Sequence, residues 1–240
     1  MRAAALLLTL LALSLGFTGA ASLAGNTAFW KTTRIPGSPP LGRESVLEEA
    51  SFVVFLVPHS HWDPDWLMPW RESSQRVSRI LASAVGLAGS QSNFKYVADQ
   101  VCFIRYFWEG STEALRRAFA AAVQSGSIEI AGGMVSQPDT VLISEPGLIW
   151  DAFLGHRWTM ETFNVTPSQV AWQCDPFGHS PALPEFLLAA GYKYVYFGRC
   201  GEGQESWLPH AFWWVGPTGA KVLAYFRDYC AGEFLSRATS

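Results

Sequence analysis

The sequence predicts an α/β protein in which a largely parallel β-sheet is connected by helical crossovers. Short apolar runs, typical of buried strands, alternate about six times with segments of helical periodicity. The segments between successive strands are too long for hairpins and long enough for a helix. The same alternation is found in open doubly wound sheets and in β/α barrels, so both architectures fit it.

The strands are expected where apolar residues are continuous and rich in β-branched and aromatic types. The first is the run FVVFLV at 52–57. A weaker strand is expected at 96–103, and further strands at 127–131, 169–174, 193–197 and 221–226.

The helices are expected between these strands. A stripe of apolar residues with helical spacing begins at Val77 and ends at Ala88. A second stripe runs from Leu115 to Val123, and Gly126 is placed to end that helix. Helices are also expected at about 146–163 and 184–190. No glycine-rich GxGxxG turn follows the first strand, which disfavours a dinucleotide-binding sheet.

Composition indicates a folded globular protein. The chain has 240 residues, of which 49% are hydrophobic and 15% charged, so a disordered tail is excluded. A net charge of −3 gives no electrostatic reason to expect a nucleic-acid partner. A complete β/α barrel typically needs about 250 residues. The part of the chain with strand and helix patterns is shorter than this, and it resembles most of a barrel.

The amino terminus has the pattern of a secretory signal peptide. A basic start is followed by an apolar run at 3–17 and then by small residues. This run is shorter than the roughly 20 apolar residues that a membrane-spanning helix needs. We therefore expect a signal peptide at 1–24, an extracellular, lysosomal or vacuolar destination, and no stable membrane span after cleavage. Cleavage after Ala20, Ala21 or Ala24 fits the pattern.

The rest of the chain divides at about residue 50. Residues 25–50 are rich in Gly, Pro, Ser and Thr without periodicity and are expected to form a linker or arm. Residues 51–240 carry the strand and helix patterns and are expected to form one domain. The four cysteines are able to pair in an oxidising compartment, in three full arrangements that the sequence does not distinguish.

Histidine and aspartate follow two of the predicted strands. His61 and Asp63 come after the first strand, and their spacing of two points both side chains the same way in extended backbone. Asp175 follows the strand at 169–174. A pair of turn histidines and a helix N-cap aspartate are the simpler interpretations. Because two of the five histidines gather in one segment, a shared zinc site that needs one more ligand or a water is favoured.

Two of these segments resemble the signature segments of a known family. HSHWDPDW and WQCDPFGHS are similar to the two signature segments of glycoside hydrolase family 38, the zinc-dependent α-mannosidases. GGMVSQPD, GHRW and YFGR occur in the expected order, and FWWVGPTG is similar to the bacterial-type branch. The resemblance covers about 52–228.

The resemblance implies a seven-stranded β/α barrel, here truncated, that hydrolyses terminal α-mannosides of glycans or glycoproteins with retention. It assigns His61 and Asp63 as zinc ligands and Asp175 as both zinc ligand and nucleophile. Among the other matched residues, the resemblance implies that Trp66 stacks on the sugar and that Arg199 lies near the nucleophile. It implies that Asp139 lies near the substrate. His59 and His179 would lie around the zinc ligands.

Some expectations follow from where this chain departs from the family. Asp65 stands where the family usually has glycine, and Trp62 replaces a smaller or polar residue. In the family, the fourth zinc ligand and the acid/base aspartate lie beyond the position of Ser240. We therefore expect a fragment that is inactive or unstable by itself. A zinc amidohydrolase or deacetylase, and an inactive carbohydrate-binding remnant, are the alternative functions.

Overall fold

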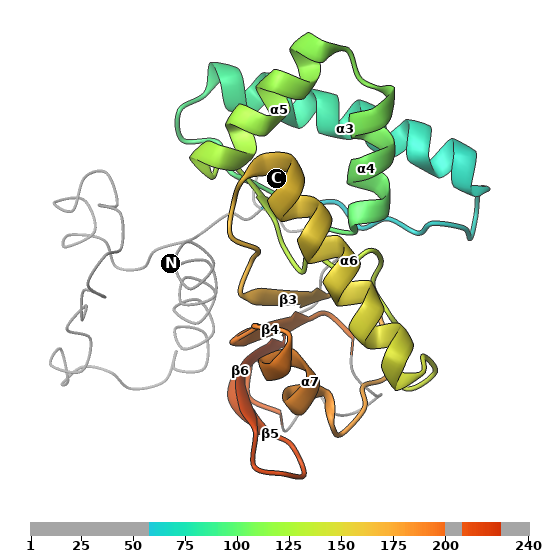
Figure 1. The fold of residues 1–240 in the computed structure, drawn as a ribbon, viewed down its shortest axis with the longest axis vertical. Coiled ribbons are helices and arrows are strands. Elements are labelled where there is room, and N and C mark those ends of the chain that lie inside the picture. The colour runs from blue at the N-terminus through green and yellow to red at the C-terminus, as the bar shows by residue number, and fades with distance from the viewer. Residues whose placement is uncertain (1–57, 200–207, 227–240) are drawn as a thin grey trace, which may run out of the picture.

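A computed structural model describes residues 58–199 and 208–226 of the chain (Figure 1). The expected signal peptide, the arm at 25–50 and the first strand at 52–57 lie outside these residues. The described elements, in chain order, are α3 (Trp70–Ser90), β1 (Tyr96–Ala98), α4 (Val101–Gly110), α5 (Glu113–Ser125), β2 (Ile128–Ile130), α6 (Glu145–Phe163), β3 (Val170–Gln173), α7 (Leu183–Ala189), β4 (Tyr194–Phe197), β5 (Ala211–Val215) and β6 (Lys221–Phe226).

The strands form two separate sheets. β1 and β2 pair in parallel, and the second sheet has the order β3-β4-β6-β5. In that sheet β3, β4 and β6 are parallel, and β5 is antiparallel to β6. The segment at 58–59 lies beside β1, because the N–H of Val97 donates to the carbonyl of Pro58 at 2.9 Å. The Gly132 N–H donates to the Val170 carbonyl at 2.8 Å, which brings the end of β2 against β3.

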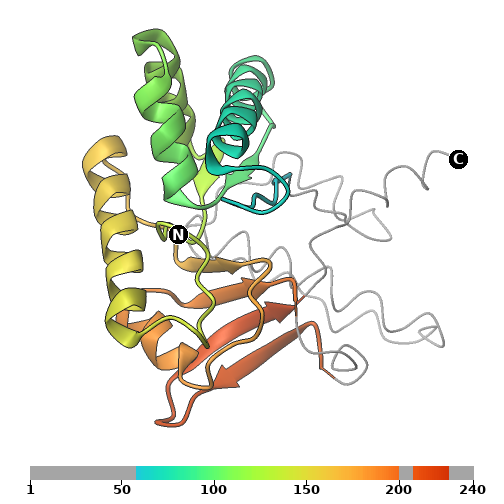
Figure 2. The same ribbon diagram turned by 90° about the vertical axis from the view of Figure 1, so that its right-hand side faces the viewer.

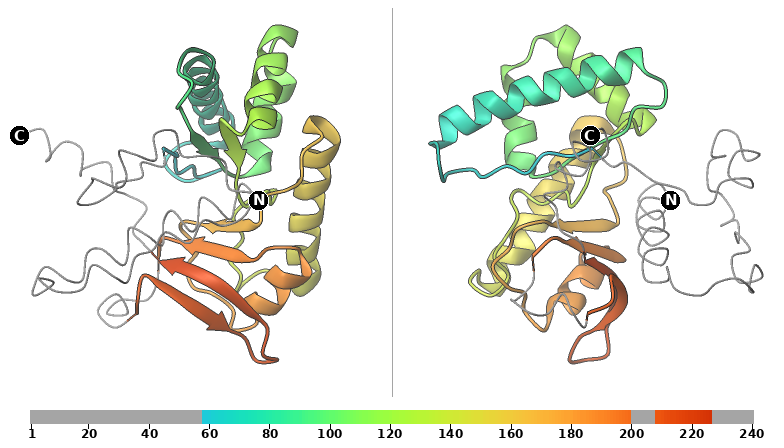
Figure 3. Two further views of the ribbon diagram at one scale, coloured as in Figure 1. Left: turned by 90° about the vertical axis from the view of Figure 1, so that its left-hand side faces the viewer. Right: turned by 180° about the vertical axis from the view of Figure 1, so that it is seen from behind.

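The helices cover these sheets in two groups. α6 and α7 lie on one side of the four-stranded sheet, and α3, α4 and α5 gather beyond its β3 edge (Figures 2 and 3). The alternating residues of β3, β4 and β6 explain this arrangement. Ala171, Val195 and Ala224 pack with α6 and α7, whereas Trp172, Tyr196 and Tyr225 belong to the core on the opposite face.

The expected α/β alternation is found, but the closed seven-stranded barrel is not confirmed. The described residues form two small sheets and no closed barrel. Two features of the backbone account for this. β2 contacts β3 at its end without forming a ladder with it, and the last described strands form the antiparallel hairpin β5–β6. The strand β5 was not expected from the sequence, and it makes a hairpin with β6 across 216–220.

The expected strand at 96–103 is correct only as far as Ala98. Gln100 adopts a positive φ of 56°, and the chain then enters α4. Val101, Ile104 and Phe107 are buried at helical spacing, so this segment packs as a helix against α3. Within the described residues, the other expected helices and strands are present, with ends shifted by a few residues. As expected, α5 ends with Gly126 in the left-handed conformation.

In the described part of the chain, no helix combines the length and the apolar character that crossing a bilayer requires.

The loop after β2 is clamped by α6. The carbonyl and the carboxylate of Asp151 accept hydrogen bonds from the N–H groups of Val135 and Ser136, at 3.2 and 3.1 Å. A Cβ atom at Gly155 would lie 2.1 Å from the Gly133 carbonyl oxygen, so only glycine allows α6 to approach this closely. The sequence of α6 thereby determines where the loop at 132–139 lies.

We expect Gly155→Ala to destabilise the domain by about 1–3 kcal/mol, because the added methyl group forces α6 away from the loop. Gly86→Ala is the control, since a Cβ there has no neighbour within 4 Å. We expect Gly86→Ala to stabilise the domain by about 0.5–1 kcal/mol, because it lowers the backbone entropy of the unfolded chain. Urea unfolding of both variants measures the difference, and equal effects would contradict the close approach.

Asp151 is expected to make stability depend on pH. Burial raises the pKa of its carboxyl to about 6. The folded state therefore holds this proton more tightly than the unfolded state, where the pKa is about 4. Stability should fall as the pH rises from about 4 to about 6 and remain lower above that range.

Asp151→Asn removes this titration. We expect the variant to be about 1 kcal/mol more stable than the wild type at pH 7, with no such advantage at pH 4. Urea unfolding across this range measures the difference. Burial also raises the pKa of Asp99 to about 6. Asp99 titrates in both proteins, so its contribution to the pH dependence cancels in the comparison. A difference that is the same at every pH would show that Asp151 is not responsible.

Candidate metal centre

The structure brings His61, Asp63 and Asp175 together. The Nε2 atom of His61 lies 3.4 Å from Oδ1 of Asp63 and 3.6 Å from Oδ2 of Asp175. One ligand atom from each of the three residues lies within 4.8 Å of the others. His61 and Asp63 come from the segment beside β1, and Asp175 follows β3. The cluster therefore spans the two sheets.

The donor set fits a zinc ion. Two atoms bound to zinc at about 2.0–2.1 Å, at a tetrahedral angle, are about 3.3 Å apart. The separations of 3.4 and 3.6 Å from His61 are close to this value. The combination of one imidazole with two carboxylates suits zinc better than calcium or magnesium, which prefer oxygen ligands alone. The three side chains are between 16% and 38% exposed, so they remain accessible to a ligand.

Arg199 completes the surroundings of Asp175. Its Nε atom donates to Oδ1 of Asp175, while the other carboxylate oxygen faces His61. The guanidinium also stands over the ring of Phe177, with 4.7 Å between its carbon and the ring centroid. Arg199 follows β4, the strand next to β3. The two oxygens of Asp175 are therefore held from different sides, which orients the carboxylate.

Asp139 holds the turn that follows Asp175. Its Oδ1 accepts a hydrogen bond of 2.8 Å from the N–H of Phe177. Next to it, the Thr140 hydroxyl accepts from the N–H of Ser180 at 3.0 Å. The structure thus places the Asp139 carboxylate against the backbone of the turn, and it is not among the clustered ligand atoms.

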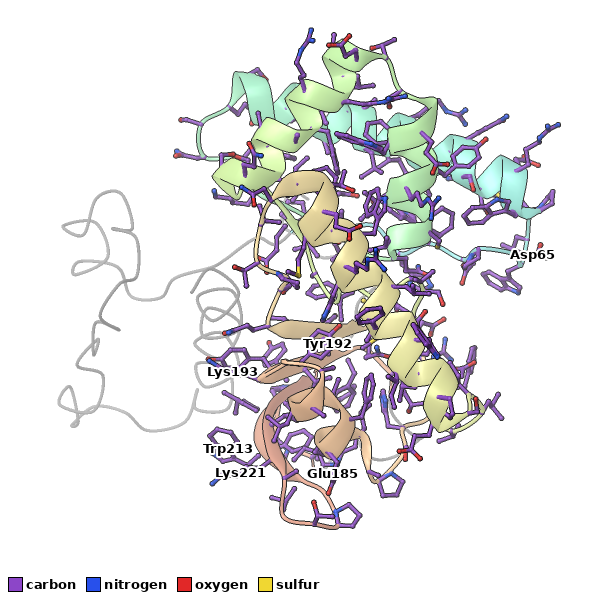
Figure 4. All side chains as sticks on the ribbon, in the orientation of Figure 1. Asp65, Glu185, Tyr192, Lys193, Trp213 and Lys221 are labelled. Carbon is purple, nitrogen blue, oxygen red and sulfur yellow. The ribbon has the colours of Figure 1, made fainter. Side chains whose placement is uncertain are left out.

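Trp66 and Asp65 lie on the exposed segment that precedes α3. Trp66 is 73% exposed, which leaves its ring free to contact a ligand. Asp65 is exposed, lies at the periphery and points away from the core (Figure 4). It does not belong to the cluster formed by His61, Asp63 and Asp175.

His59 and His179 make aromatic contacts beside the cluster. The His59 ring lies edge-on to Trp172, and that of His179 lies edge-on to Phe197, with centroids 5.4 and 5.0 Å apart. Burial lowers the pKa of both histidines, and the nearby His61 lowers that of His59 further. Neutral rings suit these apolar contacts.

The two remaining described histidines face other partners. Nε2 of His156 lies 2.7 Å from the Tyr192 hydroxyl, and Nδ1 of His210 lies 3.2 Å from the Phe226 carbonyl. An amidohydrolase site would need further histidine ligands. Within 58–199 and 208–226, the cluster contains none besides His61.

Three residues that the sequence analysis missed connect the two halves of the cluster. The side-chain oxygen of Gln137 accepts from the N–H groups of Cys174 and Asp175, at 2.8 and 3.3 Å, and its amide nitrogen donates to Asp99. Gln100 donates to the Trp62 carbonyl at 2.7 Å. Gln137 comes after the strand predicted at 127–131, so the reasoning that selected Asp175 applies to it. Asp99 lies inside the strand predicted at 96–103, and only the observed end of β1 at Ala98 places it after a strand.

Comparisons with known proteins agree with the resemblance. Residues 51–239 match the glycosyl hydrolases family 38 N-terminal domain. A probable alpha-mannosidase of Arabidopsis thaliana is 34% identical over 193 residues, which cover 75% of this chain and 19% of that relative. Alpha-mannosidase 2 of Drosophila melanogaster is 29% identical over 147 residues, which cover 61% of this chain and 13% of that relative.

The fold has a similar counterpart among solved structures. The crystal structure of an alpha-mannosidase from Enterococcus faecalis matches with a TM-score of 0.62 at 24% identity, covering 71% of this chain and 19% of that chain. The chain thus spans less than a fifth of the length of each of these relatives. Because the family match covers 51–239, most of its length, the chain belongs to glycosyl hydrolase family 38.

Proposed function

We propose that this chain carries the metal-binding and nucleophilic part of a zinc-dependent retaining α-mannosidase. The substrates are terminal α-mannosides of glycans or glycoproteins, and no nucleic acid is involved. The observation that carries the proposal is the convergence of His61, Asp63 and Asp175 from two sheets, with Arg199 bonded to Asp175. The relatives named alpha-mannosidase support the substrate class.

His61, Asp63 and Asp175 are the residues that would hold the metal. Bound zinc would supply a Lewis acid that binds and orients sugar hydroxyls. The exposed ring of Trp66 provides a flat face against which a sugar can stack, and Asp139 keeps the turn after Asp175 in place. These residues together bind and orient the mannoside.

Asp175 is the proposed nucleophile. Its carboxylate forms a bond to the anomeric carbon while the glycosidic bond breaks, and the leaving oxygen takes a proton from a general acid that we assign to no residue of this chain. Water then attacks the anomeric carbon and gives a proton to the conjugate base of that acid, while the carbon's bond to Asp175 breaks and the carboxylate is regenerated. Two successive inversions give net retention. Arg199 contributes by orienting the carboxylate before the attack.

The compartment is also part of the proposal. The pattern of residues 1–24 favours entry into the secretory pathway, with an extracellular, lysosomal or vacuolar destination. Such compartments contain glycoproteins with terminal mannose, which is consistent with the proposed substrate class.

We expect purified protein to bind about one zinc ion per chain and the His61→Ala/Asp63→Ala double variant to lose it, because two of the three donors are removed. Asp65→Asn is the matched control: it also removes a carboxylate from this segment, but one outside the cluster. Elemental analysis after dialysis measures the zinc content. Wild-type protein without zinc, or a double variant that retains it, would contradict the proposed site.

We expect Asp175→Asn to lower hydrolysis of an aryl α-mannoside by at least about 10³-fold, because a neutral amide replaces the nucleophile. Asp65→Asn should retain the activity. The assay uses the 240-residue chain and any longer product of its gene, and NMR follows the product anomer. An inverted product, or a near-normal rate for Asp175→Asn, would refute the role of Asp175. Binding without turnover would favour the carbohydrate-binding alternative.

A further inference from the structure

We propose that Asp99, Gln100 and Gln137 are positioning residues that set the spacing between the two ligand-bearing segments, 61–63 and 174–175. We call these three residues, of which Asp99 and Gln100 are buried, the brace. The inference rests on the proposed metal site and goes beyond it, because none of the three residues is one of the clustered ligands.

Gln137 connects the brace to the segment of Asp175. Its side-chain oxygen accepts from two successive backbone N–H groups, those of Cys174 and Asp175, at 2.8 and 3.3 Å. Its amide nitrogen donates to Oδ2 of Asp99. An amide whose oxygen and nitrogen both have fixed partners cannot flip, so its orientation is determined. Gln137 therefore ties the backbone at Asp175 to the end of β1.

Gln100 connects the brace to the segment of His61 and Asp63. Its amide nitrogen donates at 2.7 Å to the carbonyl of Trp62, the residue between them. Its side-chain oxygen accepts from the N–H of Gln137 at 3.4 Å. The φ of 56° at Gln100 is rare for a residue other than glycine and costs on the order of 1 kcal/mol. These hydrogen bonds offset that cost.

The sheets do not provide this connection themselves. β1 and β2 form one sheet, and β3 belongs to the other. The Gly132 N–H donates to the Val170 carbonyl, and the Ser168 hydroxyl donates to Glu129 at 2.9 Å. Both hydrogen bonds join β2 to the start of β3, at the opposite end of β3 from Asp175. The brace crosses between the sheets at the carboxyl ends, where the ligands lie. It is thus placed to control their separation.

Burial makes these bonds effective. Asp99 is 2% exposed and Gln100 is 4% exposed, so water does not compete for their hydrogen bonds. Breaking a bond to one of them leaves a buried polar group without its partner, and the backbone it held then has more freedom.

The experiment measures zinc affinity by competition with a chelator and the visible spectrum of the cobalt-substituted protein. We expect Gln137→Ala and Asp99→Ala each to weaken zinc binding by about 10–100-fold and to alter the cobalt spectrum. The double variant should be no weaker than either single variant, since both break the same link. Gln124→Ala is the control: it removes a glutamine that donates to a backbone carbonyl, that of Phe163, away from the cluster.

A rescue distinguishes this role from a general loss of packing. Gln137→Glu keeps an acceptor for the two N–H groups but faces Asp99 with a second carboxylate, so we expect weaker zinc binding. In the double variant Gln137→Glu/Asp99→Asn, the side chain at 99 becomes the donor and the side chain at 137 the acceptor. We expect this exchange to restore the zinc affinity to within about threefold of the wild type. This pair also tests the brace if Gln137→Ala fails to fold. An unrescued double variant would overturn the proposal.

Amide hydrogen exchange of metal-free protein separates the brace from the metal site. We expect exchange in the peptide at 170–177 to be faster in Gln137→Ala than in the wild type, and unchanged in Gln124→Ala. Unchanged exchange in Gln137→Ala would overturn the brace. Wild-type protein that protects this peptide but binds no zinc would overturn the proposed metal site, and with it the role of the brace in spacing the ligands.

Discussion

The two sheets of this domain meet at Gly132, and the site depends on how that junction is held. The N–H of Gly132 donates to the Val170 carbonyl, and its own carbonyl accepts from the Tyr192 hydroxyl. Gly132 has a φ of 71°, and a Cβ there would lie 3.3 Å from the backbone nitrogen of Trp172. Only a residue without a side chain fits comfortably between β2 and β3 in this conformation.

Tyr192 holds the junction at Gly132 in one position. It is fully buried and lies in the chain between α7 and β4, as labelled in Figure 4. Its hydroxyl contacts both the Gly132 carbonyl and His156 of α6. Burial raises the pKa of this hydroxyl, so it stays protonated and remains a hydrogen-bond donor. The junction therefore links β2, β3 and α6 through the N–H and the carbonyl of Gly132, and the loop that carries Gln137 begins directly after it.

The sequence predicted the elements that periodicity alone determines. The stripe from Leu115 to Val123 and the strand at 169–174 are recognisable because each depends on residues close in the chain. The start of α4 was missed because Gln100 takes a positive φ, which is stabilised by Trp62 and Gln137 from distant segments. The first strand predicted at 52–57 lies outside the described residues.

The grouping of His61, Asp63 and Asp175 was predictable because suitable residue types follow predicted strands. The electrostatics of this grouping support the proposed cation site. Asp63 and Asp175 place two carboxylates within 4.8 Å, and Arg199 bonds to only one of them. Like charges this close repel, most strongly where burial excludes water. A divalent cation bound between them would convert this repulsion into attraction, so metal binding at the proposed site would be coupled to the stability of the folded domain. The two carboxylates stay close together before a cation arrives only if their surroundings are rigid. The hydrogen bonds of Gln100 and Gln137 between the two sheets can provide this rigidity.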